Sequence, residues 1–124
     1  MNGDRLFVDT NILLYYLKGQ EEVVQLISDK DLTISFITEL ELLSFPKLTM
    51  EAENQIIGLL KNCTIVELKQ EIKNLTIDLR KKYTLKLPDA IIAASAYFYK
   101  LPLITADKAF QKLREMNIIL WENE

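Results

Sequence analysis

The sequence contains no histidine, and its only cysteine is Cys63. Without histidine, the chain cannot form a Ser-His-Asp or Cys-His catalytic arrangement, nor a metal site with imidazole ligands. A single cysteine allows no intramolecular disulfide and no cysteine-based zinc site, which favours a reducing compartment, here the cytoplasm. Any catalytic chemistry must therefore use other side chains.

Long apolar runs are also absent. The most apolar stretch, residues 90–99, is interrupted by Ser95 and followed by Lys100, and it is far shorter than the roughly 20 residues that cross a membrane. The first residues carry no apolar signal segment, so we expect no secretion and no membrane association. The formal net charge of −3 argues against a binder whose affinity comes from a broad basic surface. It leaves open a phosphate substrate that is approached through bound cations.

The length of 124 residues, with 49% hydrophobic and 27% charged residues, predicts one folded domain over residues 1–124. Short apolar strands alternate with helical patterns along the whole chain. We expect strands at residues 5–9, 32–35, 63–66, 101–105 and 118–120. We expect helices at residues 10–18, 21–28, 38–43, 49–60, 68–83, 88–99 and 107–116. This alternation predicts an α/β fold, a three-layer α/β/α sandwich with a central, mainly parallel sheet.

Several acidic residues fall where helices begin, after apolar segments. Asp9 follows the first strand, Asp107 follows the strand that ends at Thr105, and Asp89 opens the most apolar helix. Each alone suits a structural role, as a helix N-cap or as a favourable charge near the helix dipole. In open α/β sheets, however, ligands bind beyond the carboxyl ends of the strands. The three acids together therefore indicate a functional site.

A fourth acid, Glu41, lies on a partly apolar helix face between Ile37 and Phe45. A structural explanation is a capping box, in which Thr38 begins the helix and Glu41 accepts from its backbone N–H. Glu39 faces another way, but a small shift of the helix start would exchange the two glutamates. The sequence favours Glu41 as the site residue and leaves Glu39 as the alternative.

Carboxylates brought together in a partly desolvated cleft repel one another unless protons or a cation intervene. Mg²⁺ and Mn²⁺ prefer oxygen ligands and are typically held by one or two carboxylates, water and substrate phosphate. Such an ion can activate a water molecule and neutralise charge on a phosphodiester. The pattern of acids therefore indicates metal-assisted phosphoester hydrolysis.

Four segments resemble, in order and spacing, the motifs of the PIN-domain ribonucleases, and within them the VapC-like toxins of bacterial and archaeal toxin-antitoxin modules. These segments are residues 7–13 (FVDTNIL), 34–43 (ISFITELELL), 87–95 (LPDAIIAAS) and 103–110 (LITADKAF). The resemblance runs through almost the whole chain. The first motif alone is weak, but all four in order are specific.

The resemblance implies that Asp9, Glu41, Asp89 and Asp107 form an acidic quartet that binds Mg²⁺ or Mn²⁺ and performs catalysis. It implies supporting roles for Asn11 and Thr105. It also implies a PIN-like fold, endoribonuclease activity on RNA, a homodimer, and inhibition by a cognate antitoxin that covers or distorts the acidic cleft.

Three other interpretations remain. A phosphatase with Asp9 as nucleophile would need a second acid two residues later, where this chain has Asn11. A phospho-acceptor receiver domain would need an acidic pair at the end of the first strand and would leave Glu41 and Asp89 unexplained. A PIN-like RNA-binding or scaffold module without catalytic activity would keep the fold, but the presence of all four acids weighs against it.

Overall fold

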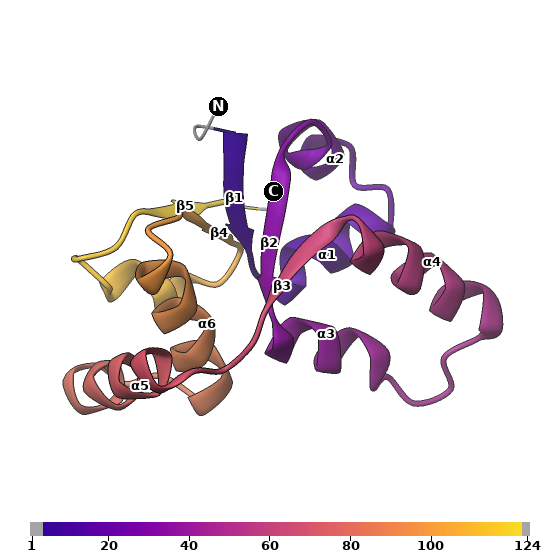
Figure 1. Cartoon of the computed structure of the whole chain (residues 1–124). Helices are drawn as coiled ribbons and strands as arrows, with labels where there is room; N and C mark the ends of the chain where they lie inside the picture. Colours follow the sequence, from indigo (N-terminus) through magenta and orange to yellow (C-terminus); the bar gives the residue numbers. More distant parts are fainter. Residues whose placement is uncertain (1–3, 123–124) are drawn as a thin grey trace.

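A computed structural model describes residues 4–122, which form a sheet of five parallel strands between layers of helices (Figure 1). The strands are β1 (Arg5–Val8), β2 (Asp31–Ser35), β3 (Cys63–Val66), β4 (Leu103–Thr105) and β5 (Ile118–Leu120). The helices are α1 (Thr10–Leu17), α2 (Glu21–Ile27), α3 (Phe36–Leu43), α4 (Met50–Lys61), α5 (Gln70–Lys82), α6 (Leu87–Phe98) and the 3₁₀ helix η2 (Lys108–Lys112). The expected three-layer α/β/α fold is confirmed.

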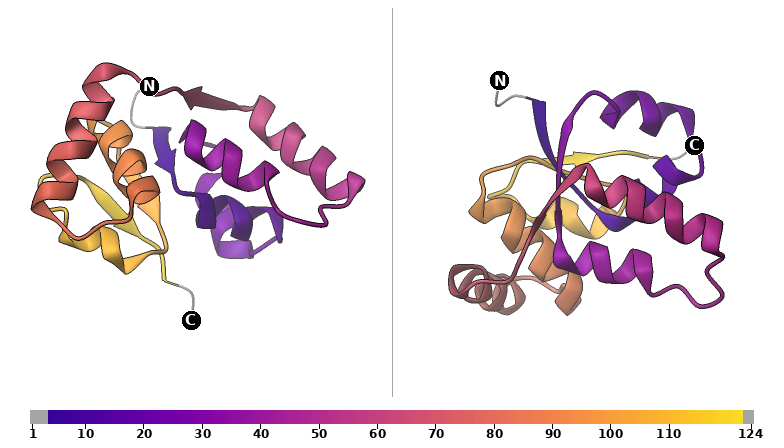
Figure 2. Two further views of the ribbon diagram at one scale, coloured as in Figure 1. Left: turned by 90° about the horizontal axis from the view of Figure 1, so that it is seen from below. Right: turned by 45° about the vertical axis from the view of Figure 1, so that its right-hand side comes forward.

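Two apolar cores form because side chains alternate between the two faces of each strand. On β1, Phe7 packs into the core beneath α5, α6 and η2, whereas Leu6 and Val8 pack into the core beneath α1, α2 and α4. On β4, Leu103 and Ile104 divide in the same way. Figure 2 shows α5 and α6 on one side of the sheet and α1 and α4 on the other. Both faces of the sheet are therefore covered.

The strand order β3-β2-β1-β4-β5 places β1 at the middle of the sheet. The chain moves outward from β1 through β2 to β3, and then returns to the other side of β1 to form β4 and β5. The boundary between β1 and β4 is therefore the point at which the strand order reverses, which is where ligands bind in open α/β sheets. Asp9 follows β1 and Asp107 follows β4 at this boundary.

Helix α6 is buried along most of its length, as its apolar sequence predicts. Every residue from 90 to 96 is buried, and Pro88 lies in the first turn, where its missing N–H removes no helical hydrogen bond. Close packing of small side chains fixes this helix within its layer. Asp89 is consequently held in the first turn of a rigid element.

The expected start of α3 was wrong. The helix begins at Phe36, and the hydroxyl of Ser35 caps it by accepting a hydrogen bond of 3.0 Å from the backbone N–H of Ile37. Thr38 is therefore a buried residue inside the helix, and the capping box of Thr38 with Glu41 does not form. The cap falls on Ser35 because α3 follows β2 directly, with no loop residue between them.

The helix expected over residues 107–116 was too long. Only the 3₁₀ helix η2, Lys108–Lys112, forms there, and it begins at the cap residue Asp107. The chain must turn after Leu113, which is buried, in order to reach β5. Within residues 4–122, no helix combines the length and the apolar character needed to cross a bilayer.

Candidate active site

The four expected acids line one pocket of about 460 Å³ at the carboxyl edge of the sheet. They come from four separate elements: Asp9 caps α1, Glu41 lies on α3, Asp89 lies in the first turn of α6, and Asp107 caps η2. Glu39 is not among the residues that line this pocket. The fold thus brings together residues that span most of the sequence, and of the two glutamates on α3 it brings Glu41.

Asp9 is the most deeply buried of these acids, with 5% of its surface exposed. Its Oδ1 accepts a hydrogen bond of 2.7 Å from the backbone N–H of Thr10, and its Oδ2 accepts one of 2.7 Å from the hydroxyl of Thr105. The pKa of Asp9 is raised to about 6, first by burial and then by the charges of Asp89 and Asp107, while the two hydrogen bonds act in the opposite direction. A bound cation would favour the ionised form of this carboxyl group.

Thr105 also fixes Asp107. Its Oγ1 accepts a hydrogen bond of 3.0 Å from the backbone N–H of Asp107, and the Oδ1 of Asp107 accepts one of 2.9 Å from the backbone N–H of Ala109. The pKa of Asp89 is raised, first by burial and then by the negative charges of Asp107 and Glu41, and Lys86 partly opposes these effects. The acids therefore interact electrostatically across the pocket.

Glu41 is anchored by threonines that the sequence analysis did not assign to the site. Its Oε1 accepts a hydrogen bond of 2.5 Å from the hydroxyl of Thr10, whose oxygen lies 2.9 Å from the hydroxyl oxygen of Thr38. The position of Thr10 directly after Asp9 was a usable signal. The role of Thr38 depends on how α1 packs against α3, which local sequence patterns do not reveal.

The two expected supporting residues lie in different places. Asn11 lines the pocket, whereas Thr105 is fully buried behind it and acts through its bonds to Asp9 and Asp107. Leu14 and Phe45 add an apolar part to the pocket wall, and Phe45 is 42% exposed. The sequence analysis used Phe45 only to define a helix face and missed its place at the pocket.

The donor set of the pocket suits a hard divalent cation. Within residues 4–122, no group of three or more carboxylate or thiol side chains could hold a metal ion in its present arrangement. Mg²⁺ does not require such a group, because one or two direct carboxylates with water molecules are its usual protein ligands. The carboxylate oxygens of the pocket supply such ligands, and the pKa values of Asp9 and Asp89, raised first by burial and then by neighbouring negative charges, show that a cation would be favoured there.

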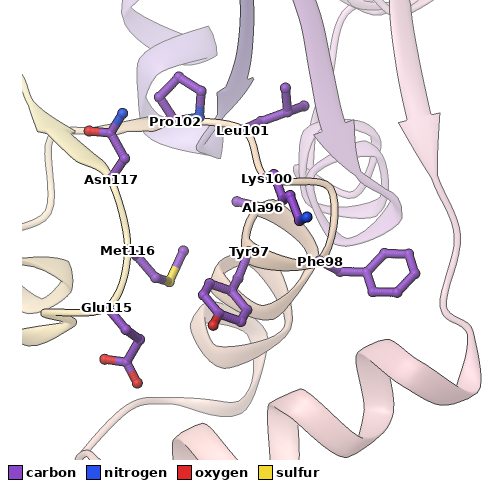
Figure 3. A pocket seen from close by; sticks show the side chains of 9 residues that line it. All are labelled: Ala96, Tyr97, Phe98, Lys100, Leu101, Pro102, Glu115, Met116 and Asn117. Carbon is purple, nitrogen blue, oxygen red and sulfur yellow. The ribbon is translucent and has the colours of Figure 1, made fainter.

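A second cavity shows that this acidity is local. It has a volume of about 440 Å³ and is lined by residues at the end of α6 and in the segments that lead into β4 and β5 (Figure 3). Tyr97 and Met116 line it, and Glu115 is its one carboxylate. It lies at the amino ends of these strands, opposite the edge that carries Asp9. Of these two pockets, only the first is lined by a group of acids.

A comparison with known protein families identifies the family of this chain. The family model described as PIN domain matches residues 6–116. The chain belongs to the PIN domain family. Across 96% of this chain and 95% of the relative, this PIN domain is 28% identical to Ribonuclease VapC2 of Methanocaldococcus jannaschii.

Solved structures agree with the fold of this PIN domain. A chain of a toxin-antitoxin complex from Klebsiella pneumoniae is 31% identical, with a TM-score of 0.83 over 95% of this chain and 99% of that chain. A chain of VapBC2 from Rickettsia felis, bound to a promoter DNA fragment, gives a TM-score of 0.80 over 95% of this chain and 99% of that chain. Its identity of 19% supports the shared fold alone.

Proposed function

We propose that this PIN domain is an endoribonuclease that hydrolyses RNA phosphodiester bonds with Mg²⁺ or Mn²⁺, and that it is the toxin of a toxin-antitoxin pair. The observation that carries the proposal is the meeting of Asp9, Glu41, Asp89 and Asp107 at one pocket. The similarity to Ribonuclease VapC2 and to a chain of a toxin-antitoxin complex supports it.

In this proposal the four carboxylates hold the cation and its water ligands, and Asn11 and Thr105 support them. When bound, the ion would activate a water molecule and neutralise charge on the phosphodiester. Asp9 is the best fixed ligand, because hydrogen bonds from Thr10 and Thr105 orient both of its oxygens. The ion would also oppose the burial and the repulsion between carboxylates that together raise the pKa values of Asp9 and Asp89.

The surroundings of the acids are compatible with an RNA strand. Because the net charge is −3, phosphate groups would be attracted mainly by the bound cation and not by a broad basic surface. The exposed ring of Phe45 beside the acids offers an apolar surface on which an unpaired base could stack. We further propose a homodimer, and a cognate antitoxin that blocks the acidic pocket, both acting in the cytoplasm.

The test is cleavage of a mixed RNA pool by the purified protein with Mn²⁺, with Mg²⁺ and with EDTA. Asp9→Asn and Asp89→Asn should abolish metal-dependent cleavage, because each removes a negative charge while nearly conserving shape. Asp78→Asn is the matched control, because Asp78 is exposed on α5 and does not line the acidic pocket. It should cleave like the wild type.

Retained cleavage by both Asp9→Asn and Asp89→Asn at saturating metal would overturn the assigned site. A folded wild-type protein that binds Mn²⁺ but cleaves no RNA in the pool would overturn the proposed activity on general RNA. That result would favour a PIN-like RNA-binding or scaffold module.

A further inference from the structure

Glu41 is held differently from Asp9 and Asp107, the two acids of the pocket that cap helices. Asp9 and Asp107 are helix caps, and each accepts a hydrogen bond from a backbone N–H. Glu41 is exposed on α3, and its carboxylate accepts a hydrogen bond from the side chain of Thr10. Glutamate also has one more rotatable side-chain bond than aspartate. Its placement therefore depends more strongly on a side-chain anchor.

The hydrogen bonds around Thr10 have a defined direction. The hydroxyl of Thr10 donates its single hydrogen to Oε1 of Glu41, 2.5 Å away. The contact of 2.9 Å between the hydroxyl oxygens of Thr10 and Thr38 must then use the hydrogen of Thr38. The result is a directed relay from Thr38 to Thr10 to Glu41.

The relay links the first turn of α1 to α3. Thr38 is fully buried and lies three residues before Glu41 on the same helix, so its hydroxyl is a fixed starting point. Successive hydrogen bonds polarise one another, which strengthens the bond that reaches the carboxylate. An anchored glutamate also loses less side-chain freedom when it binds an ion than a free one does.

We propose that Thr38 is a positioning residue for the acidic pocket, and that it acts on Glu41 through the hydroxyl of Thr10. The relay engages Oε1 of Glu41 and leaves Oε2 available to a cation or to one of its water ligands. This inference rests on the proposed function, because it assumes that the pocket binds a divalent cation. Thr38 itself does not line the pocket, so its effect is indirect.

The test is calorimetric titration of the metal-free protein with Mn²⁺. Thr38→Val keeps the branched shape and removes the hydroxyl, and we expect it to weaken Mn²⁺ affinity about tenfold, in the range typical of residues that orient metal ligands. Thr38→Ser keeps the hydroxyl and should restore affinity close to that of the wild type. Thr76→Val is the matched control, because Thr76 is a buried threonine on α5 whose hydroxyl donates a hydrogen bond of 2.8 Å to the carbonyl of Ile72. Its Mn²⁺ affinity should be unchanged.

A double-variant cycle separates positioning from a general packing effect. In a Glu41→Ala background, Thr38→Val should cause no further loss of Mn²⁺ affinity, because the relay then has nothing to position. An equal loss in both backgrounds would overturn the inference, as would wild-type affinity in Thr38→Val alone. If circular dichroism shows that Thr38→Val is unfolded, the smaller Thr38→Ala replaces it in the same comparisons.

The same titrations distinguish failure of the inference from failure of the proposed function. If the wild-type protein cleaves no RNA but Thr38→Val weakens Mn²⁺ binding, the proposed activity is overturned and the relay is kept. If the wild-type protein needs Mn²⁺ for cleavage but Thr38→Val leaves its Mn²⁺ affinity unchanged, the relay is overturned and the activity is kept. A wild-type protein that binds no Mn²⁺ would overturn both.

Discussion

Thr105, at the end of β4, donates a hydrogen bond of 2.7 Å to Oδ2 of Asp9, which follows β1. The parallel register that pairs Val8 with Ile104 carries these two residues to the same edge of adjacent strands, although 96 positions separate them in sequence. The buried carboxylate is thus fixed by strand pairing and not by a mobile loop. An ion held by Asp9 would meet a ligand that is already in place.

Thr105→Val should destabilise the metal-free protein, and more at pH 8 than at pH 5. Removing a hydrogen bond from a buried carboxylate costs on the order of 1–3 kcal/mol. The pKa of Asp9 is about 6, so the group is mostly neutral at pH 5 and depends less on the donor there. Urea unfolding in EDTA at both pH values measures the difference. Thr76→Val should lower the free energy of unfolding by the same amount at both pH values. An equal loss at both pH values for Thr105→Val would contradict the role assigned to Thr105.

The stability of the metal-free protein should decrease as the pH rises from about 4 to about 6. Burial raises the pKa of Asp9 from 3.8 to about 6 on folding, so the folded state binds more protons than the unfolded chain in this interval. The free energy of unfolding then falls with rising pH, by about 3 kcal/mol at most for a shift of this size. Below about pH 4 this loss of stability is absent, and above about pH 6 it is fully present.

Asp9→Asn should remove most of this dependence, because the amide has no charge to bury. Urea unfolding in EDTA between pH 4 and pH 7 is the measurement. Asp78→Asn, on the exposed surface of α5, should keep the slope of the wild type. A slope that survives in Asp9→Asn would assign it to other groups, of which Asp89, with its raised pKa, is the first to examine.

The fold could be predicted from sequence because its signals are local. Apolar runs and helical periodicity gave the alternation of strands and helices, and the acids that follow β1 and β4 stood out as soon as the strands were assigned. The start of α3 could not be predicted in the same way. Ser35 and Thr38 are both good caps, and the choice between them depends on where β2 leaves the sheet.

The site was predictable in its acids and less so in their supports. A motif records which carboxylates occur, but the hydroxyl relay of Thr38 and Thr10 depends on contact between α1 and α3, 28 positions apart in sequence. Phe45 was missed for the same reason. Its place at the pocket is set by where the chain leaves α3, and its residue type alone does not reveal this.

Glu41→Gln should weaken Mn²⁺ binding more than Glu39→Gln. Glu41 lines the acidic pocket and shares its electrostatic field with Asp89, whereas Glu39 lies outside the residues that line it. Removing the charge of Glu41 therefore removes part of the attraction for the cation, while removing that of Glu39 acts only at longer range. Calorimetric titration of both variants under identical conditions is the measurement. The reverse order would mean that Glu39 is the ligand on α3.

Phe45→Ala should raise the KM for single-stranded RNA about tenfold and leave Mn²⁺ affinity unchanged. The ring is 42% exposed and lines the acidic pocket, and stacking of one base on an aromatic side chain contributes about 1–3 kcal/mol. Phe45→Trp, which keeps an aromatic face, should retain a low KM. Leu40→Ala is the control, because Leu40 is exposed on α3 but does not line the pocket. An unchanged KM in Phe45→Ala would show that the ring takes no part in binding RNA.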